Sequence, residues 1–267
     1  MSVRVYTGPH ADRRRGPSSL WGRLPVVLAI LTVLAQIAWP LVHGTGRATL
    51  TAITVGLFFL TSLTHAWTSR GLGWMLGWLS ASLLFGWGVE LLGTRTGFPF
   101  GTYTYDAGAL GPSVAGVPVV IPMAWAMMSY PALLVGRRLV AGVLTVPLVA
   151  GWALASWDLF LDPQMTGESY WRWASPTVTL HGVPGVPVLN YLGWFVAAVV
   201  LMLVLDRLPR RRNAAEGVPA ALYLWTWVGG IVANAFFFDR PWVAVWGGIG
   251  MGLVAVPYAF SLPRDRA

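Results

Sequence analysis

The chain has 267 residues, of which 56% are hydrophobic and only 10% charged, and its formal net charge is +8. Soluble domains carry roughly 25% charged residues, so this composition excludes an ordinary soluble protein and indicates an integral membrane protein. Cysteine and lysine are absent from the sequence, which excludes disulfides, thiolate metal ligands, cysteine nucleophiles and Schiff-base lysines. The positive charge comes from arginines, which we expect to lie against anionic lipid headgroups and not against nucleic acid.

Eight apolar windows follow one another, and each is long enough to cross a hydrocarbon core of about 30 Å as a helix. They cover residues 24–42, 48–67, 71–93, 117–136, 139–161, 186–205, 218–238 and 242–262. Residues 1–23 are basic and have no apolar core, so we interpret them as a disordered cytoplasmic tail, with a second tail at 263–267. The sequence predicts an all-α, polytopic transmembrane helical bundle that forms one domain over residues 24–262.

Arginines set the expected orientation, because short cytoplasmic loops hold an excess of basic residues. With the N-terminus inside, fourteen of the eighteen arginines fall on the cytoplasmic side. The other four, on the outside, are Arg47, Arg95, Arg172 and Arg240. This distribution predicts a multi-pass protein of the cell membrane with both termini in the cytoplasm.

Two connections between the windows are long, and both are expected outside. In residues 94–116, Tyr103 and Tyr105 alternate with threonines, which is typical of a short strand or of residues at the membrane interface. Residues 162–188 hold Trp171 and Trp173, and aromatic rings of this kind favour headgroup depth. We therefore expect the second connection to lie on the bilayer surface.

Acidic side chains concentrate at the outer ends of the windows and in the outer connections. They are Glu90, Asp106, Asp158, Asp162, Glu168 and Asp239. A carboxylate within a membrane is costly and marks a functional site by default, although Glu90 paired with Arg95, or Asp162 exposed at a helix end, would be structural alternatives. Asp158 and Asp162 are four residues apart, which puts them on one helix face. We therefore place a candidate site at the outer end of the bundle.

Such a carboxylate pair can hold Mg²⁺ for a diphosphate, or it can divide into a protonated acid and an ionised base. A diphosphate site needs several cations, and the outer side offers only four dispersed arginines, which favours acid–base chemistry. Aromatic rings are plentiful there and can stabilise a cation through their faces. The candidate substrate-binding residues are Trp87, Phe98, Phe100, Tyr103, Tyr105, Trp125, Trp157, Asn190 and Trp194.

Several of these residues fall in motifs that resemble a known family. The motifs are Gly88-Val-Glu90, Thr96-Gly-Phe-Pro-Phe-Gly-Thr-Tyr-Thr-Tyr105, Pro122-Met-Ala-Trp125, Trp157-Asp-Leu-Phe-Leu-Asp-Pro163 and Asn190-Tyr-Leu-Gly-Trp194. Over residues 71–206 the chain resembles the carotenoid biosynthesis membrane proteins that include the CruF-type carotenoid hydratases. The resemblance implies addition of water to the terminal double bond of an acyclic carotenoid end, giving a tertiary alcohol, with no cofactor or metal.

For this reaction we expect Asp158 to be the acid because it lies deeper, and Asp162 to be the base that activates water because it lies closer to the surface. Glu90 is a third carboxyl able to replace either. The carotenoid is expected to come laterally from the bilayer, with other membrane enzymes of the pathway as partners. Two alternatives stay open. The chain could be a Mg²⁺-dependent prenyltransferase or a carotenoid cyclase, or it could be a carrier or proton-coupled transporter of carotenoids.

Overall fold

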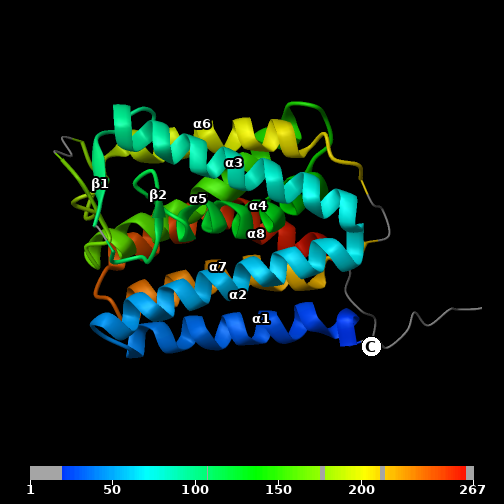
Figure 1. Cartoon of the computed structure of the whole chain (residues 1–267), viewed down its shortest axis with the longest axis horizontal. Coiled ribbons are helices and arrows are strands. Elements are labelled where there is room, and N and C mark those ends of the chain that lie inside the picture. Colours follow the sequence, from blue (N-terminus) through cyan, green and yellow to red (C-terminus); the bar gives the residue numbers. More distant parts are fainter. Residues whose placement is uncertain (1–19, 107, 175–177, 211–213, 263–267) are drawn as a thin grey trace, which may run out of the picture.

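The computed structural model describes residues 20–106, 108–174, 178–210 and 214–262. Eight α-helices in this part of the chain lie along one long axis (Figure 1), which confirms the predicted helical bundle. Most of the two predicted tails, residues 1–19 and 263–267, lies outside the described residues. The helices are α1 (Leu20–Ala38), α2 (Thr45–Arg70), α3 (Leu72–Thr96), α4 (Val120–Leu139), α5 (Thr145–Gly167), α6 (Val188–Leu205), α7 (Gly217–Phe236) and α8 (Pro241–Ser261), with a short 3₁₀ turn at Trp39–Leu41 after α1.

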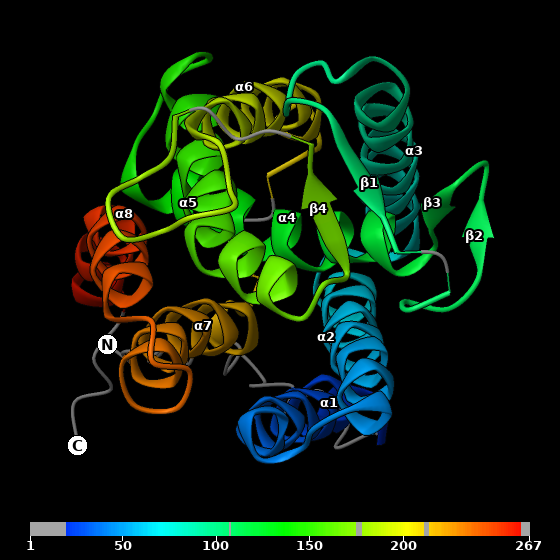
Figure 2. The ribbon, with the colours of Figure 1, turned by 90° about the vertical axis from the view of Figure 1, so that its left-hand side faces the viewer.

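The helices differ in how much of their surface is buried inside the bundle. Six of the eight described helices are long and apolar enough to span a membrane, and the two that are not are α4 and α5. These two lie in the middle of the bundle, where the other helices surround them (Figure 2), and most of their side chains are buried. Leu84 of α3 and Leu253 of α8, by contrast, are exposed, as expected for side chains that face lipid. Helices inside the bundle can therefore carry polar groups that lipid-facing helices cannot.

Helix α5 ends later than the sequence predicts, which changes the position of Asp162. Its apolar window ends at residue 161, and the proline that follows Asp162 favours a helix end there. The helix instead continues through Pro163 to Gly167, so Asp162 lies within it and is only 2% exposed. Hydropathy falls at this point because the helix enters a polar protein interior, and not because it leaves the bundle.

The two long connections pair with each other at one end of the bundle, which we call the outer end. Strand β1 (Tyr103–Tyr105) runs antiparallel to β4 (Trp171–Trp173), with Tyr103 opposite Trp173 and Tyr105 opposite Trp171. A small hairpin of β2 (Ser113–Val114) and β3 (Val117–Pro118) stands beside them (Figure 2). The predicted strand at Tyr103–Tyr105 is confirmed, whereas the expected surface position is wrong for Trp171, which is buried in this sheet.

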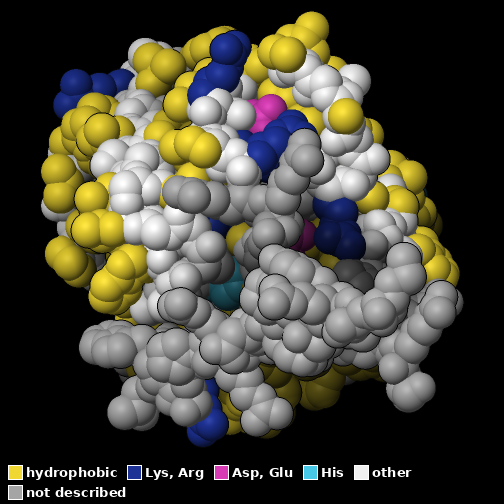
Figure 3. Space-filling view, turned by 90° about the vertical axis from the view of Figure 1, so that its right-hand side faces the viewer, with side chains coloured by type: hydrophobic (Ala, Val, Ile, Leu, Met, Phe, Trp, Pro, Cys, Tyr) yellow, Lys and Arg dark blue, Asp and Glu magenta, His cyan; other side chains and the backbone are white. Residues whose placement is uncertain are grey.

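At the opposite end, the inner end, ion pairs join helices that are distant in sequence. Arg137 donates through Nε to Oδ1 of Asp206 at 2.7 Å, and Arg70 and Arg138 both reach Glu216, at 3.5 and 3.3 Å. Arginine and acidic side chains lie next to one another on this end in Figure 3. The apolar windows on the sequence did not include Glu216, because the window begins at residue 218, whereas Glu216 is the N-cap residue of α7.

Candidate functional site

Asp158 and Asp162 meet an amide from the neighbouring helix. They lie one turn apart on α5, and both are buried. Nδ2 of Asn190, on α6, donates to Oδ2 of Asp158 at 2.8 Å and also to Oδ2 of Asp162. Trp171 of β4 donates through Nε1 to Oδ1 of Asp162 at 3.0 Å. We call Asp158, Asp162 and Asn190 the carboxyl pair and its amide.

Both carboxyl groups accept from the same Asn190 amide, so they lie close to each other. Two ionised carboxylates this close would repel each other, and a single proton shared by the pair would relieve that repulsion. Asp162 accepts from neutral donors at both of its oxygens, whereas Oδ1 of Asp158 is buried without a protein partner. With one proton on the pair, its donation leaves both carboxyl groups ionised until a proton returns, so the pair would act first as acid and then as base.

Glu90 of α3 is held in a different way. Its Oε2 accepts from the hydroxyls of Tyr103 at 2.5 Å and Tyr105 at 2.6 Å, and its Oε1 accepts from Nε1 of Trp125 at 3.0 Å. Burial and the neighbouring Glu90 carboxylate raise the pKa of both tyrosines, which therefore keep their protons and remain donors. Three donors hold the Glu90 carboxyl group in one orientation. No ion pair joins Glu90 to Arg95 in the described part of the chain, so the pairing considered from the sequence is not formed.

A cavity of about 530 Å³ joins the two groups of acids. Glu90, Asp162 and Asn190 line it, and Asp158 lies behind Asp162 and outside the lining. Most of the other lining side chains are apolar or aromatic, as in sites that bind apolar ligands. The sequence-predicted residues brought together in this cavity are Glu90, Phe100, Tyr103, Tyr105, Trp125, Trp157, Asp162, Asn190 and Trp194.

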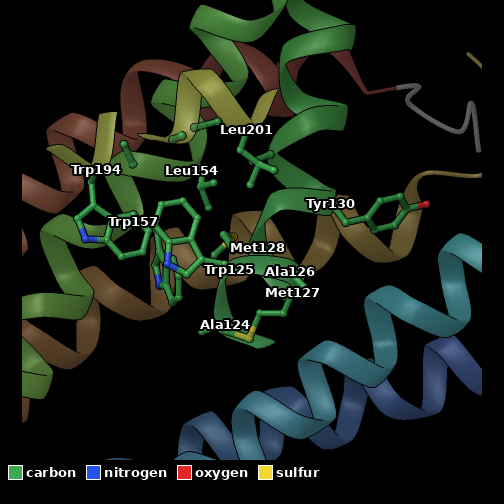
Figure 4. Packing of buried hydrophobic residues seen from close by; sticks show 14 of the residues in the cluster. Ala124, Trp125, Ala126, Met127, Met128, Tyr130, Leu154, Trp157, Trp194 and Leu201 are labelled. Carbon is green, nitrogen blue, oxygen red and sulfur yellow. The ribbon is translucent and has the colours of Figure 1, made fainter. Parts of the chain in front are cut away.

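Three indole rings from three helices form one side of the cavity beside Glu90. Trp125 and Trp194 stack with their centroids 4.1 Å apart and their planes 2° from parallel, and Trp157 meets Trp194 edge-on at 6.4 Å. Figure 4 shows these three rings gathered together, while Tyr130 on α4 points away toward the other end. Such rings present electron-rich faces that can stabilise a cation. The stack and the Glu90 carboxyl oxygens therefore present electron-rich groups to an otherwise apolar cavity.

Two predicted substrate-binding residues lie elsewhere. Phe98 is 66% exposed, and Trp87 donates through Nε1 to the carbonyl of Val114 in the small hairpin, so neither lines the cavity. Sequence analysis also missed Trp171, the donor to Asp162. Its signal was the alternation of Trp171 and Trp173, which has the same period of two as Tyr103 and Tyr105 and predicts a strand with one buried face.

Further lining residues gave no signal in the sequence, because helix packing alone brings them to the cavity. They are Gln36 on α1, Phe160 on α5 and Trp225 on α7. Among the residues that the structure describes, no three Asp, Glu, His or Cys side chains are grouped so that they could hold a metal ion.

The fold and the site define a polytopic helical membrane protein with a largely apolar internal cavity and buried carboxyl groups at its outer end. The chain belongs to the carotenoid biosynthesis protein family, which it matches over residues 26–256, and the resemblance noted in the sequence is thereby confirmed.

A curated relative is the bisanhydrobacterioruberin hydratase of Haloarcula japonica, which is 36% identical over 135 residues. The matched region covers 48% of this chain and 43% of that protein, so the chain aligns with less than half of its relative's length. No solved structure matches the chain.

Proposed function

We propose that this protein is a carotenoid hydratase, which adds water to the terminal double bond of an acyclic carotenoid end and yields a tertiary alcohol. The observation that carries the proposal is the close pair of buried carboxyl groups beside an apolar, aromatic cavity, with Glu90 as a third carboxyl group that lines it. Family membership and the name of the curated relative support the same reaction.

In the proposed reaction, Asp162 donates the proton of the pair to the less substituted carbon of the alkene. The double bond is consumed, and a tertiary carbocation forms at the other carbon. Glu90 and the faces of Trp125 and Trp194 stabilise that cation, because charge develops there only in the transition state. The oxygen of a water molecule then bonds to the cation, and one of its protons returns to the pair.

This scheme changes the roles that were expected from the sequence. Asp158 was assigned as the acid because it lies deeper, but Asp162 is the member of the pair that lines the cavity. We therefore propose that Asp162 exchanges the proton with substrate and water, and that Asp158 holds Asp162 in place and keeps the proton within the pair. The scheme uses no cofactor from outside the chain.

The test is expression of the full chain in the cell membrane of a host that accumulates an acyclic carotenoid. We expect a pigment whose mass is increased by one water, and growth in water enriched in heavy oxygen should label the new hydroxyl. A label that comes from dioxygen would contradict hydration. An unchanged pigment mass with altered chromatography would favour a cyclase, and an added isoprenoid unit would favour a prenyltransferase. Unaltered pigment, with the protein present in the membrane, would favour a carrier or transporter.

A further inference from the structure

The cavity does not end at the carboxyl groups. It extends across the bundle to the seam between α1 and α7, where its lining residues are also exposed on the outside of the protein. Ile37 on α1 is 48% exposed, and Val228 and Val232 on α7 are 46% and 42% exposed. Residues that line a cavity and are exposed at the same time mark its mouth, so the cavity opens sideways through this seam.

The surroundings of the mouth are apolar. Both α1 and α7 are long and apolar enough to cross a membrane, so the mouth faces the hydrocarbon of the bilayer. The top of the cavity, by contrast, is covered by Tyr103, Tyr105, Trp171 and Trp173 of the β1–β4 sheet. A ligand that is insoluble in water thus finds a direct path from lipid to the carboxyl groups.

One polar contact crosses the seam. Nε1 of Trp225, on α7, donates to Oε1 of Gln36, on α1, at 2.8 Å, and both residues line the cavity. Helix α1 packs mainly against α2 and only lightly against α7 (Figure 2). Just beyond the ends of the two helices, Trp39 meets Phe238 edge-on with ring centroids 5.3 Å apart. Side-chain hydrogen bonds between membrane helices stabilise by only about 0.6 kcal/mol on average. The polar contact across the seam can therefore open and close readily.

The passage from the mouth to the carboxyl groups is wide on its α7 side, because one of its lining residues is a glycine. Gly229 lines the cavity one turn before Val232, and a Cβ placed on it would meet nothing closer than the Trp225 ring at 3.5 Å. A larger side chain at Gly229 would therefore fit without displacing backbone, and it would occupy the passage. The passage is therefore open at Gly229 because glycine has no side chain to fill it.

We infer that the α1–α7 seam is the lateral gate through which a long polyene enters from the bilayer, with the Gln36–Trp225 hydrogen bond as its closing contact. The inference rests on the proposed function for the identity of the ligand, an apolar chain that has its reactive end at the carboxyl pair. The rest of the polyene lies in the passage and extends between α1 and α7 into lipid.

The first test narrows the passage. We expect Gly229→Leu and Val232→Trp to lower hydration of a full-length acyclic carotenoid by about tenfold or more, since a blocked path acts on every turnover. A short isoprenoid alkene with the same end group, which fits entirely inside, should be hydrated at nearly the unaltered rate. The matched controls are Gly73→Leu, where a Cβ meets nothing within 4 Å, and Leu84→Trp on lipid-facing α3.

The second test does not depend on catalysis and uses the absence of native cysteine. Val232→Cys and Leu84→Cys are labelled separately with an apolar maleimide in detergent, with and without an added acyclic carotenoid. We expect the carotenoid to slow labelling at position 232 severalfold and to leave position 84 unaffected.

The two tests separate the gate from the chemistry. Protection at position 232 without any hydrated product would support the gate and overturn the proposed reaction. Hydration that survives Gly229→Leu and Val232→Trp for the long substrate, or equal labelling with and without carotenoid, would overturn the gate and leave the reaction standing.

Discussion

The acidic residues of the inner end and those of the outer cavity have opposite kinds of partner. At the inner end Asp206 and Glu216 are paired with Arg137, Arg70 and Arg138. At the outer end Glu168 is also paired with an arginine, Arg47. The donors to Glu90 and Asp162 in the described part of the chain, however, are tyrosine, tryptophan and asparagine side chains, and all of these are neutral. Acidic residues are therefore neutralised in the ion pairs and only hydrogen-bonded at the cavity.

The kind of partner distinguishes carboxyl groups that stabilise the fold from carboxyl groups that can react with a ligand. An arginine partner cancels the charge and fixes the carboxylate in one protonation state, which joins helices but leaves nothing to donate. A neutral donor orients the group and leaves its charge, or its proton, available to a ligand. A cavity adjoins the acids of the outer end, and we expect substitutions at the two ends to separate activity from stability.

The largest effect on activity is expected from Asp162→Asn. The amide has nearly the same shape, but it cannot exchange the proton of the pair, and general acid–base catalysis contributes about 10²–10⁴-fold to a rate. Hydrated pigment per amount of folded protein should fall by about that factor. The matched change Asp206→Asn at the inner end should leave this ratio unchanged. If Asp162→Asn and Asp206→Asn had equal activity, the proposed chemical role of the outer acid would be wrong.

Glu90→Gln should come next, with a loss of about 10²-fold, because it removes a charge that faces the developing cation. The cation is absent when the substrate first binds and forms only as the reaction proceeds, so kcat should fall while KM stays near its original value. A rise in KM alone would instead assign Glu90 to substrate binding. Steady-state kinetics in reconstituted vesicles distinguishes the two results.

A smaller loss, about tenfold, is expected from Trp125→Phe, which keeps an aromatic face but weakens cation stabilisation and removes a donor to Glu90. The inner-end control is Trp74→Phe, where the lost donor served the carbonyl of Pro209 at 3.0 Å. The same pigment assay applies to both variants. A Trp74→Phe loss as large as that of Trp125→Phe would point to general packing and away from the site.

The smallest effect on activity is expected from Glu216→Gln, which removes the charge shared by Arg70 and Arg138. Hydration per folded molecule should not change. Stability should fall by about 2 kcal/mol, because hydrogen bonds to charged groups contribute about that much and Arg70 is buried. Thermal unfolding in detergent measures the loss, and unfolding at the original midpoint would show that the inner ion pairs contribute little.

The sequence was sufficient to predict the helical class, because crossing a hydrocarbon layer requires long apolar segments that are visible in composition. It set the end of α5 too early, because it could not distinguish a helix leaving the membrane from one that enters a polar protein interior. The spacing of Asp158 and Asp162 identified the carboxyl pair, since helix geometry fixes which residues share a face.

The partners of those acids were harder to predict. Trp171 reaches Asp162 only because β4 pairs with β1, and such pairing between distant segments leaves little local signal. Trp87 and Phe98 fall in or beside the recognisable motifs, yet the structure turns them away from the cavity. Their place in or beside a motif predicted that these residues belong to the site. It could not predict the direction in which each side chain points.

The β1–β4 sheet has a consequence for exchanging parts between related proteins. Through Tyr103 and Tyr105 its first strand holds Glu90, and through Trp171 its second strand holds Asp162, so two short segments far apart in the chain set both acids at once. A shift of one residue in either strand would turn its rings to the opposite face. The two outer connections therefore form one transferable module: a chimera that exchanges both should keep its chemistry, and one that exchanges a single connection should lose it.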